Sequence, residues 1–496
     1  MSETETTLEN GTPALDEARV RQRVRSGVAL LAIRGALLKA IGVLGTLVLT
    51  QLLTPHDFGI LAIGFSIIGL AFFLGDAGLG SAYIRRPEPP TRLELGAVVG
   101  LQATVAGTIA VAVTGIAVLT ASRTLEVGAL MAWSLPIISM RVPGQIMLER
   151  EIRYRPQITV ELVEVLVYNS CAIAAAALGA GVWGVAGAIY GGSLGSVIAM
   201  RFVSPVGLVA PSPQFRVLAG TLRFSTAFQA ANLITVGRDQ AVNFGIAGIA
   251  GVAVLGLWSI TFRLLAIPYL VFQSLWRVSF PGMARLLESG ADPRPIIERS
   301  IGLSATFTGF VLAGLVGSSP IAIPALLGHQ WTGATTALPW ACLGLLATPI
   351  STAAAGFLYA KGDAGTVLRT TAYQAIAMLA VGLGLLHWLG LTAIGLGWLA
   401  AHLVDGVVIA RGVRRFIQVD VVRPLLGPVV AATASAGAGW LAASVIPSTV
   451  LNGILLGLAV LIAYVGVHAV AARGQLIGTV NFLRRRAGPQ EVAVPQ

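Results

Sequence analysis

Apolar stretches recur along the whole chain, separated by short breaks that hold charged or turn-forming residues. A helix needs about 20 apolar residues to cross the hydrocarbon layer of a bilayer. Fourteen stretches approach or exceed that length, and they alone predict an all-α polytopic membrane protein with 14 transmembrane helices. The expected spans are residues 29–53, 58–83, 95–119, 126–147, 157–180, 182–203, 224–249, 252–276, 300–325, 334–358, 367–389, 391–410, 424–446 and 450–472.

The charge content excludes several classes of protein. Only 11% of the 496 residues are charged, whereas soluble proteins carry about 25%. A soluble metabolic enzyme or a secreted disulfide scaffold is therefore excluded. The net charge of +11 does not indicate a nucleic-acid partner, because the basic residues lie in the breaks between spans. Cys171 and Cys342 both fall in apolar runs, and we expect them to act as small hydrophobic residues. No metal site is expected.

The placement of basic residues predicts the orientation. Of the 33 lysines and arginines, 27 lie in the terminal segments and alternate connections that would face the cytoplasm. Only Arg123 lies in an outer connection, and the other five lie inside spans. Cytoplasmic loops are enriched in Lys and Arg, so both termini are predicted to be cytoplasmic. The first 28 residues lack the apolar core of a cleavable signal peptide.

A weak internal repeat predicts two lobes. Residues 51–61 and 248–258 align at a shift of 197 residues, which places Gly59 over Gly256 at the start of a span. Because the match recurs six spans later, we expect two pseudo-symmetric six-helix lobes, followed by two additional helices. The expected divisions are a cytoplasmic amino-terminal segment (1–28), an N-lobe (29–203), a cytoplasmic linker (204–223), a C-lobe (224–410), helices 13 and 14 (424–472) and a cytoplasmic tail (473–496).

Several short motifs resemble one known family. Residues 53–59 read LTPHDFG and are similar to an L-T-P-x-D-F-G turn, and residues 75–80 read GDAGLG. The chain thereby resembles the lipid-linked oligosaccharide (polysaccharide) flippases of the multidrug/oligosaccharidyl-lipid/polysaccharide (MOP) exporter superfamily, over roughly residues 26–420. The resemblance implies two lobes that give alternating access to a central cavity. Weaker similarities lie at residues 148–151, 179–187, 280–281 and 327–331.

Five cations lie within the expected spans: Arg34, Lys39, Arg141, Arg238 and Arg263. A charge at the centre of a bilayer is costly, and such residues usually face a bundle interior or a water-filled cavity. Arginine binds phosphate through two parallel hydrogen bonds. We therefore predict a diphosphate site formed by Arg34, Lys39 and Arg263, with Arg238 and Arg141 as second choices. The alternative is that Arg34 and Arg141 extend to the inner headgroups.

The acids inside the spans are candidates for structural pairing or ion coupling. Asp76 is expected to pair with Lys39, and Asp239 is a candidate partner for Arg263. Arg238 is expected to find partners on other helices rather than the adjacent Asp239, because neighbouring residues point about 100° apart on a helix. Asp405 is a candidate site for Na⁺ or H⁺ as coupling ion, or else it bonds to a neighbouring helix.

Glu161 and Glu164 share a helix face near the inner end of their span. This position near the inner end predicts that they are hydrated.

These observations predict a non-enzymatic transporter in the cytoplasmic (inner) membrane of a bacterium. Its expected substrate is an undecaprenyl-pyrophosphate-linked oligosaccharide, flipped from the cytoplasmic to the outer leaflet through the cationic cavity. No cofactor is expected apart from a coupling ion. Candidate partners are membrane lipids, a polysaccharide polymerase and glycosyltransferases.

Rival functions differ in the residues they require. A flippase for the peptidoglycan precursor lipid II would share the span count and the basic cavity. A cation-coupled multidrug exporter would need an acid-rich cavity, and a membrane glycosyltransferase or polymerase would need a large outer loop with catalytic residues. The outer connections hold few ionisable side chains, and a structural scaffold gives no reason for cations inside spans.

Overall fold

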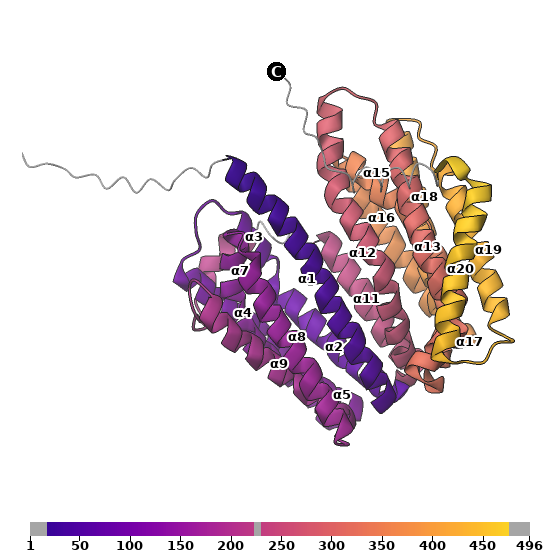
Figure 1. Ribbon diagram of the computed structural model, residues 1–496. Helices are drawn as coiled ribbons and strands as arrows, with labels where there is room; N and C mark the ends of the chain where they lie inside the picture. Colours follow the sequence, from indigo (N-terminus) through magenta and orange to yellow (C-terminus); the bar gives the residue numbers. More distant parts are fainter. Residues whose placement is uncertain (1–16, 223–229, 476–496) are drawn as a thin grey trace, which may run out of the picture.

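The computed structural model describes residues 17–222 and 230–475, and every regular element in these ranges is a helix. Figure 1 shows two groups of helices that converge at the end where α2 (Pro55–Asp76) and α12 (Val252–Glu288) begin and diverge at the opposite end. We call the first the convergent end and the second the divergent end. The first 16 residues, Arg223 of the linker and the tail beyond Gln475 lie outside the described residues.

The N-lobe comprises α1 to α9, and two of its expected spans are broken. The second span divides at Ala77 and Gly78, whose φ angles of 45° and 79° end α2 and begin α3. The first helix begins at Glu17 rather than residue 29, because the helix continues through the polar residues before the apolar stretch. The remaining bounds are α1 (Glu17–Leu52), α3 (Leu79–Arg85), α4 (Arg92–Thr120), α5 (Arg123–Ala132), α6 (Leu135–Ser139), α7 (Val142–Arg150), α8 (Tyr154–Ala177) and α9 (Gly181–Val203).

The C-lobe repeats this arrangement, and two further helices pack on its outside. Both α19 (Arg423–Ala442) and α20 (Val450–Ala471) contact α13 (Arg294–Leu327). A short helical turn, η1 (Phe215–Leu218), lies in the linker between the lobes. The other elements are α11 (Ala230–Ile249), η2 (His329–Thr335), α14 (Leu338–Leu345), α15 (Thr348–Ala360), α16 (Ala364–Ala377), η3 (Met378–Leu383), α17 (Leu386–Leu389) and α18 (Leu391–Arg414).

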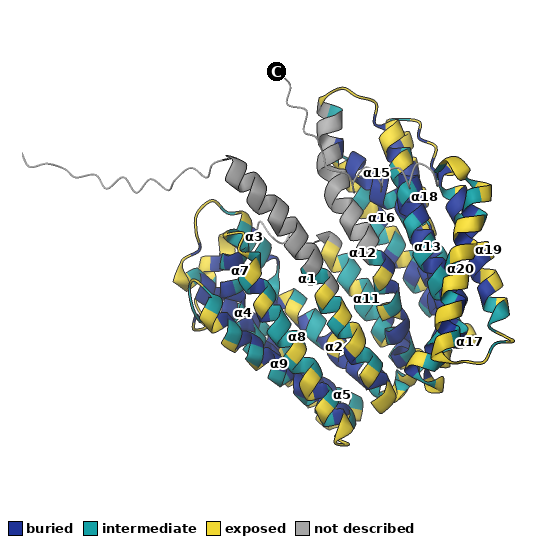
Figure 2. Ribbon diagram, viewed as in Figure 1, coloured by how far each residue is buried: buried dark blue, intermediate teal, exposed yellow. Residues whose placement is uncertain are grey.

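The outer surface of the helices suits a bilayer. Eleven helices of the described chain are long and apolar enough to cross one, or twelve with the bent set α5 to α7. The two other expected spans correspond to α1 and α11. The structure is therefore compatible with 14 transmembrane helices, and that number stays a prediction. Large apolar side chains such as Val118 and Ile462 are more than 70% exposed. Figure 2 shows exposed residues along helices such as α20. Such a surface is stable only in contact with lipid.

The two lobes meet most closely where α2 crosses α12. A Cβ added to Gly59 would lie 1.8 Å from the Val252 carbonyl oxygen, and one added to Gly256 would lie 1.8 Å from that of Pro55. Each residue of this reciprocal contact lies 197 positions from its counterpart. The structure therefore confirms the repeat, and glycine is required because only a residue without a Cβ lets two helices approach so closely.

Polar contacts close the convergent end around this crossing. Trp331 donates its indole N–H to the carbonyl of Thr50 over 3.1 Å, and Gln51 donates to the carbonyl of Leu326 over 2.8 Å. The ring of Phe58 packs edge-on against Trp331 with centroids 4.8 Å apart. The end of α1 and the start of α2 are thus held against η2 of the other lobe.

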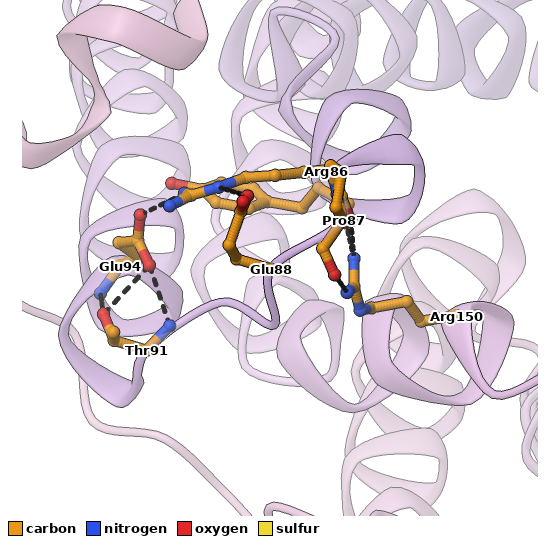
Figure 3. A network of polar contacts seen from close by, with 7 residues as sticks. Arg86, Pro87, Glu88, Thr91, Glu94 and Arg150 are labelled. Atoms are coloured by element: carbon orange, nitrogen blue, oxygen red, sulfur yellow. Dashed lines mark hydrogen bonds and ion pairs between the residues drawn. The ribbon is translucent and has the colours of Figure 1, made fainter. Parts of the chain in front are cut away.

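At the divergent end, a polar network fixes the loop between α3 and α4 (Figure 3). Arg150 at the end of α7 donates hydrogen bonds to the carbonyls of Tyr83, Arg86 and Pro87. Arg86 in turn pairs with Glu94 over 2.6 Å. These contacts use three backbone carbonyls that the helices leave free, and they give Arg150 a structural role.

Candidate functional site

A cavity of about 510 Å³ lies between the lobes and is lined by α1, α2, α8, α11, α12 and α18. Its wall is mostly apolar, with polar side chains at a few positions. Asn243 of α11 donates a hydrogen bond to Ser66 of α2 over 2.9 Å, which joins the lobes across the cavity. Tyr168 and Asn169 of α8 also line it. A concave, mostly apolar space with a few convergent polar groups is typical of a ligand site.

Arg263 of α12 lines this cavity, and its side chain is exposed to it. Its guanidinium donates to the hydroxyl of Thr46 in α1 over 2.9 Å. No ion pair of Arg263 or Lys39 is found among the described residues. Lys39 lies two turns from Thr46 along α1 and contacts the carbonyl of Ala266 in α12 at 3.5 Å. Two cations without a neutralising acid thus lie along the seam between α1 and α12.

Two cations of the N-lobe, Arg34 and Arg141, are neutralised by acids of α8. Arg34 forms a two-point ion pair with Glu161, and Arg141 pairs with Glu164. These four side chains are between 18% and 27% exposed. Arg34 and Arg141 therefore contact acids on another helix in this structure, and both glutamates are paired rather than simply hydrated. Whether any of the cations binds substrate stays a prediction.

The expectation for Arg238 was wrong in one respect. Arg238 pairs with the adjacent Asp239, with N···O distances of 2.7 and 2.8 Å. The argument from helix geometry fails because the arginine side chain is long enough to fold back over one residue. Arg238 also donates to Gln374 of α16 over 3.4 Å and lies 5.8 Å from the ring centroid of Trp398. The proposed pair between Arg263 and Asp239 is replaced by this contact.

Asp76 and Asp405 both accept hydrogen bonds from neutral groups. Asp76 accepts from the backbone N–H groups of Gly78 and Gly80, at 3.1 and 3.3 Å, and so stabilises the break between α2 and α3. The expected pair between Asp76 and Lys39 is not formed, because the carboxylate turns toward these local donors. Asp405 of α18 accepts from the hydroxyl of Ser351 in α15.

The cavity also contains aromatic residues that the sequence analysis did not single out. Trp258, Phe262 and Trp398 pack together, with centroids between 5.7 and 6.1 Å apart. Behind them, His402 accepts or donates a 3.2 Å hydrogen bond with the hydroxyl of Tyr269. Polar residues within spans, such as Asn169 and Asn243, were the available signal for the cavity wall.

Comparisons with known proteins identify the same group of transporters. Residues 48–336, more than half of the chain, match the family model described as polysaccharide biosynthesis protein. The chain is 23% identical over 339 residues to the lipopolysaccharide biosynthesis protein WzxC of Escherichia coli K12, covering 66% of this chain and 68% of that protein. It is 27% identical over 339 residues to the succinoglycan biosynthesis transport protein ExoT of Rhizobium meliloti, covering 62% and 63%.

Solved structures support the fold. A lipid II flippase, MurJ, in an inward closed conformation matches with a TM-score of 0.69 at 14% identity, covering 90% of this chain and 99% of that one. An inward-facing multidrug transporter of the MATE family matches with a TM-score of 0.56 at 16% identity, covering 76% and 94%. At these identities the likeness establishes the two-lobe fold alone.

Proposed function

Because the chain belongs to the polysaccharide biosynthesis protein family within the MOP superfamily, we propose that it flips an undecaprenyl-pyrophosphate-linked oligosaccharide from the cytoplasmic to the outer leaflet of a bacterial inner membrane. Both termini are then cytoplasmic, and the convergent end faces outward. The structure would be the inward-facing state of an alternating-access cycle. No covalent step is required, because the substrate changes leaflet without a change in its bonds.

The observation that carries this proposal is the pair of un-neutralised cations at the seam between α1 and α12. A guanidinium in a cavity with few competing water molecules attracts a diphosphate more strongly than it would in bulk water. Arg263 is the principal contact because it lines the cavity, and Lys39 contributes from the same seam. Arg34, Arg141 and Arg238 retain their ion pairs and position the helices around the site.

The seam between α1 and α12 also offers a path for the lipid chain. Two hydrogen bonds bridge it in the described chain, a long one of 3.5 Å from Lys39 to the carbonyl of Ala266 and one of 2.9 Å from Arg263 to Thr46. A diphosphate that binds both cations replaces these bonds and leaves α1 free to move from α12. The head group would then lie in the cavity while the polyprenyl tail stays in the bilayer.

Two carboxylates of the C-lobe could couple transport to an ion gradient. Asp405 and Asp239 are the candidate carboxylates for Na⁺ or H⁺ coupling. Asp405 is bonded to Ser351, whereas Asp239 is paired with Arg238, so Asp405 is the one without a cationic partner in the described chain. The lipid II flippase and the cation-coupled multidrug exporter remain the rival functions.

The experiment that tests the function compares a deletion strain with the same strain carrying the wild-type gene. We expect undecaprenyl-diphosphate-linked oligosaccharide to accumulate in the inner leaflet of the deletion strain and to fall on complementation. Lipid II and drug sensitivity are measured in the same cells. Accumulation of lipid II, or a change in drug sensitivity alone, would establish a rival function in place of this one.

A further inference from the structure

We propose that a slot in the N-lobe, adjacent to the central cavity between α2 and α8, binds the sugar residues of the lipid-linked substrate. The inference rests on the proposed function and names a second part of the same site. The slot has a volume of about 450 Å³, within the range of small-molecule pockets. Phe65 and Tyr168 line both the slot and the central cavity, so the two spaces are adjacent.

The walls of the slot offer two kinds of surface. Phe65 and Phe72 of α2 and Tyr168 of α8 supply aromatic rings, and Ser193 of α9 lies at the base. The ion pair of Arg141 with Glu164 supplies the strongest polar groups. The C–H face of a pyranose ring packs against aromatic side chains, and its hydroxyl groups need polar partners at the rim. The slot provides both.

The ion pair suits a neutral polyhydroxyl ligand better than a charged one. Arginine can only donate hydrogen bonds and an ionised carboxylate can only accept them, whereas a sugar hydroxyl does both. Adjacent hydroxyls of one sugar can therefore bridge Arg141 and Glu164 without breaking the neutrality of the pair. Because the two charges of the pair cancel, the pair gives neither an anion nor a cation a net attraction.

The difference in charge between the slot and the central cavity assigns the diphosphate and the sugar of the head group to different places. The cation and the anion of the slot are paired with each other. The central cavity is lined by Arg263 and Asp239, but Asp239 is paired with Arg238, so Arg263 has no ion-pair partner in the described chain. The diphosphate is directed to Arg263, and the sugar that follows it is directed to the neutral slot. Tyr168 lies between the two regions because it lines both.

The C-lobe residue that corresponds to Phe65 has different neighbours. Phe262 lies 197 residues after Phe65 and lines the other side of the central cavity. Its ring packs edge-on against Trp398, with centroids 5.7 Å apart, and Trp398 packs against Trp258 at the same separation. Two tryptophan rings thus lie beside Phe262, whereas the slot lies beside Phe65. For this reason the proposal places the sugar in the N-lobe.

The test measures protection of single cysteines from a maleimide in native membranes. Phe72→Cys reports on the slot and Phe262→Cys on the central cavity, and the two side chains are similarly exposed, at 45% and 43%. Both are made in a chain with Cys171→Ala and Cys342→Ala. The membranes come from a strain that makes its own lipid-linked oligosaccharide and from one that cannot attach the first sugar. Purified undecaprenyl diphosphate is added to the second as a sugar-free probe.

We expect the native substrate to slow labelling of both cysteines severalfold, and the sugar-free probe to slow labelling of Phe262→Cys alone. Protection of Phe262→Cys without protection of Phe72→Cys would overturn the sugar slot and leave the flippase function intact. Protection of Phe72→Cys by the sugar-free probe would assign the slot to another part of the lipid. Failure to label Phe72→Cys in the empty protein would show that the slot is closed to water. Protection of neither would contradict the proposed function itself.

A second experiment measures export by a variant in which a larger side chain fills the slot. Ser193→Phe places a ring at its base, where Ser193 is 2% exposed, and should reduce oligosaccharide export severalfold. Leu194→Phe is the matched control, because Leu194 is 48% exposed on the same helix and lines none of the described cavities. Both proteins are quantified in the membrane. Normal export by Ser193→Phe at normal protein level would overturn the inference.

Discussion

The two lobes begin alike and differ in how they treat charge and space. At the convergent end, α2 and α12 make the same contact in opposite directions, with Gly59 and Gly256 at equivalent positions. Deeper in the molecule the N-lobe neutralises Arg34 through Glu161 and leaves a slot beside Phe65. The C-lobe neutralises Arg238 through the adjacent Asp239 and leaves Arg263 without an ion-pair partner in the described chain. The N-lobe cation Lys39, likewise unpaired there, lies across the seam from α12. The symmetric contact between α2 and α12 thus closes the convergent end. The candidate binding sites lie where the two lobes differ.

The largest effect is expected where the lobes are alike. Gly59→Leu and Gly256→Leu should each separate α2 from α12, because backbone atoms lie where the Cβ would be. Overpacking of this kind costs about 3 kcal/mol, which would shift closure of the convergent end roughly 150-fold. Export should be lost, and Leu53→Cys, 2% exposed in this structure, should become accessible to an impermeant maleimide from outside.

The control is Gly248→Leu, because no atom lies within 4 Å of its added Cβ. It should retain export. Normal export by only one of Gly59→Leu and Gly256→Leu would show that the two glycines do not contribute equally to closure.

The next effect tests the unpaired charge of the C-lobe. Arg263→Ala removes the cation that lines the cavity, and a hydrogen bond to a charged group contributes about 1.5–3 kcal/mol. Lipid-linked oligosaccharide should accumulate in the inner leaflet, with export reduced roughly ten- to a hundredfold. Arg263→Lys should restore part of the activity because it keeps the charge without the planar fork. Unchanged export with Arg263→Ala would show that this cation is structural.

A double-mutant cycle tests whether the N-lobe cation is structural. Glu161→Leu alone leaves Arg34 without its partner and should destabilise the protein by about 1–3 kcal/mol. Arg34→Met with Glu161→Leu should recover most of that stability, since an ion pair can be replaced by apolar residues at little cost. Unfolding of the purified protein in detergent gives the stability. Loss of export by the stable double variant would place Arg34 in the substrate site.

The smallest effect is expected for Lys39. Its contact with the Ala266 carbonyl is long, at 3.5 Å, and Lys39 is absent from the lining of the cavity. Lys39→Ala should reduce export only about two- to tenfold, as for the loss of about 0.5–1.5 kcal/mol, and Lys39→Arg should export normally. A loss as severe as that of Arg263→Ala would make the two cations equal contributors to the diphosphate site.

Much of the fold could be predicted from the sequence because each helix that crosses a bilayer needs its own run of about 20 apolar residues. Each expected span corresponds to one helix or to consecutive helices of the described chain, and the alignment of Gly59 with Gly256 identified the crossing of α2 and α12. The breaks at Ala77 and within the fourth span were missed, since an apolar composition does not reveal a change of backbone angle inside a span.

The sequence by itself determined which charges lie inside the membrane, because hydropathy is a property of one segment at a time. Only the tertiary structure decided which of them are neutralised. Arg34 and Glu161 are 127 residues apart, and their contact depends on how α1 and α8 are rotated against each other. The slot beside Phe65 likewise depends on the separation of α2 from α8. Partners and cavities arise from the packing of helix faces, which no single segment specifies.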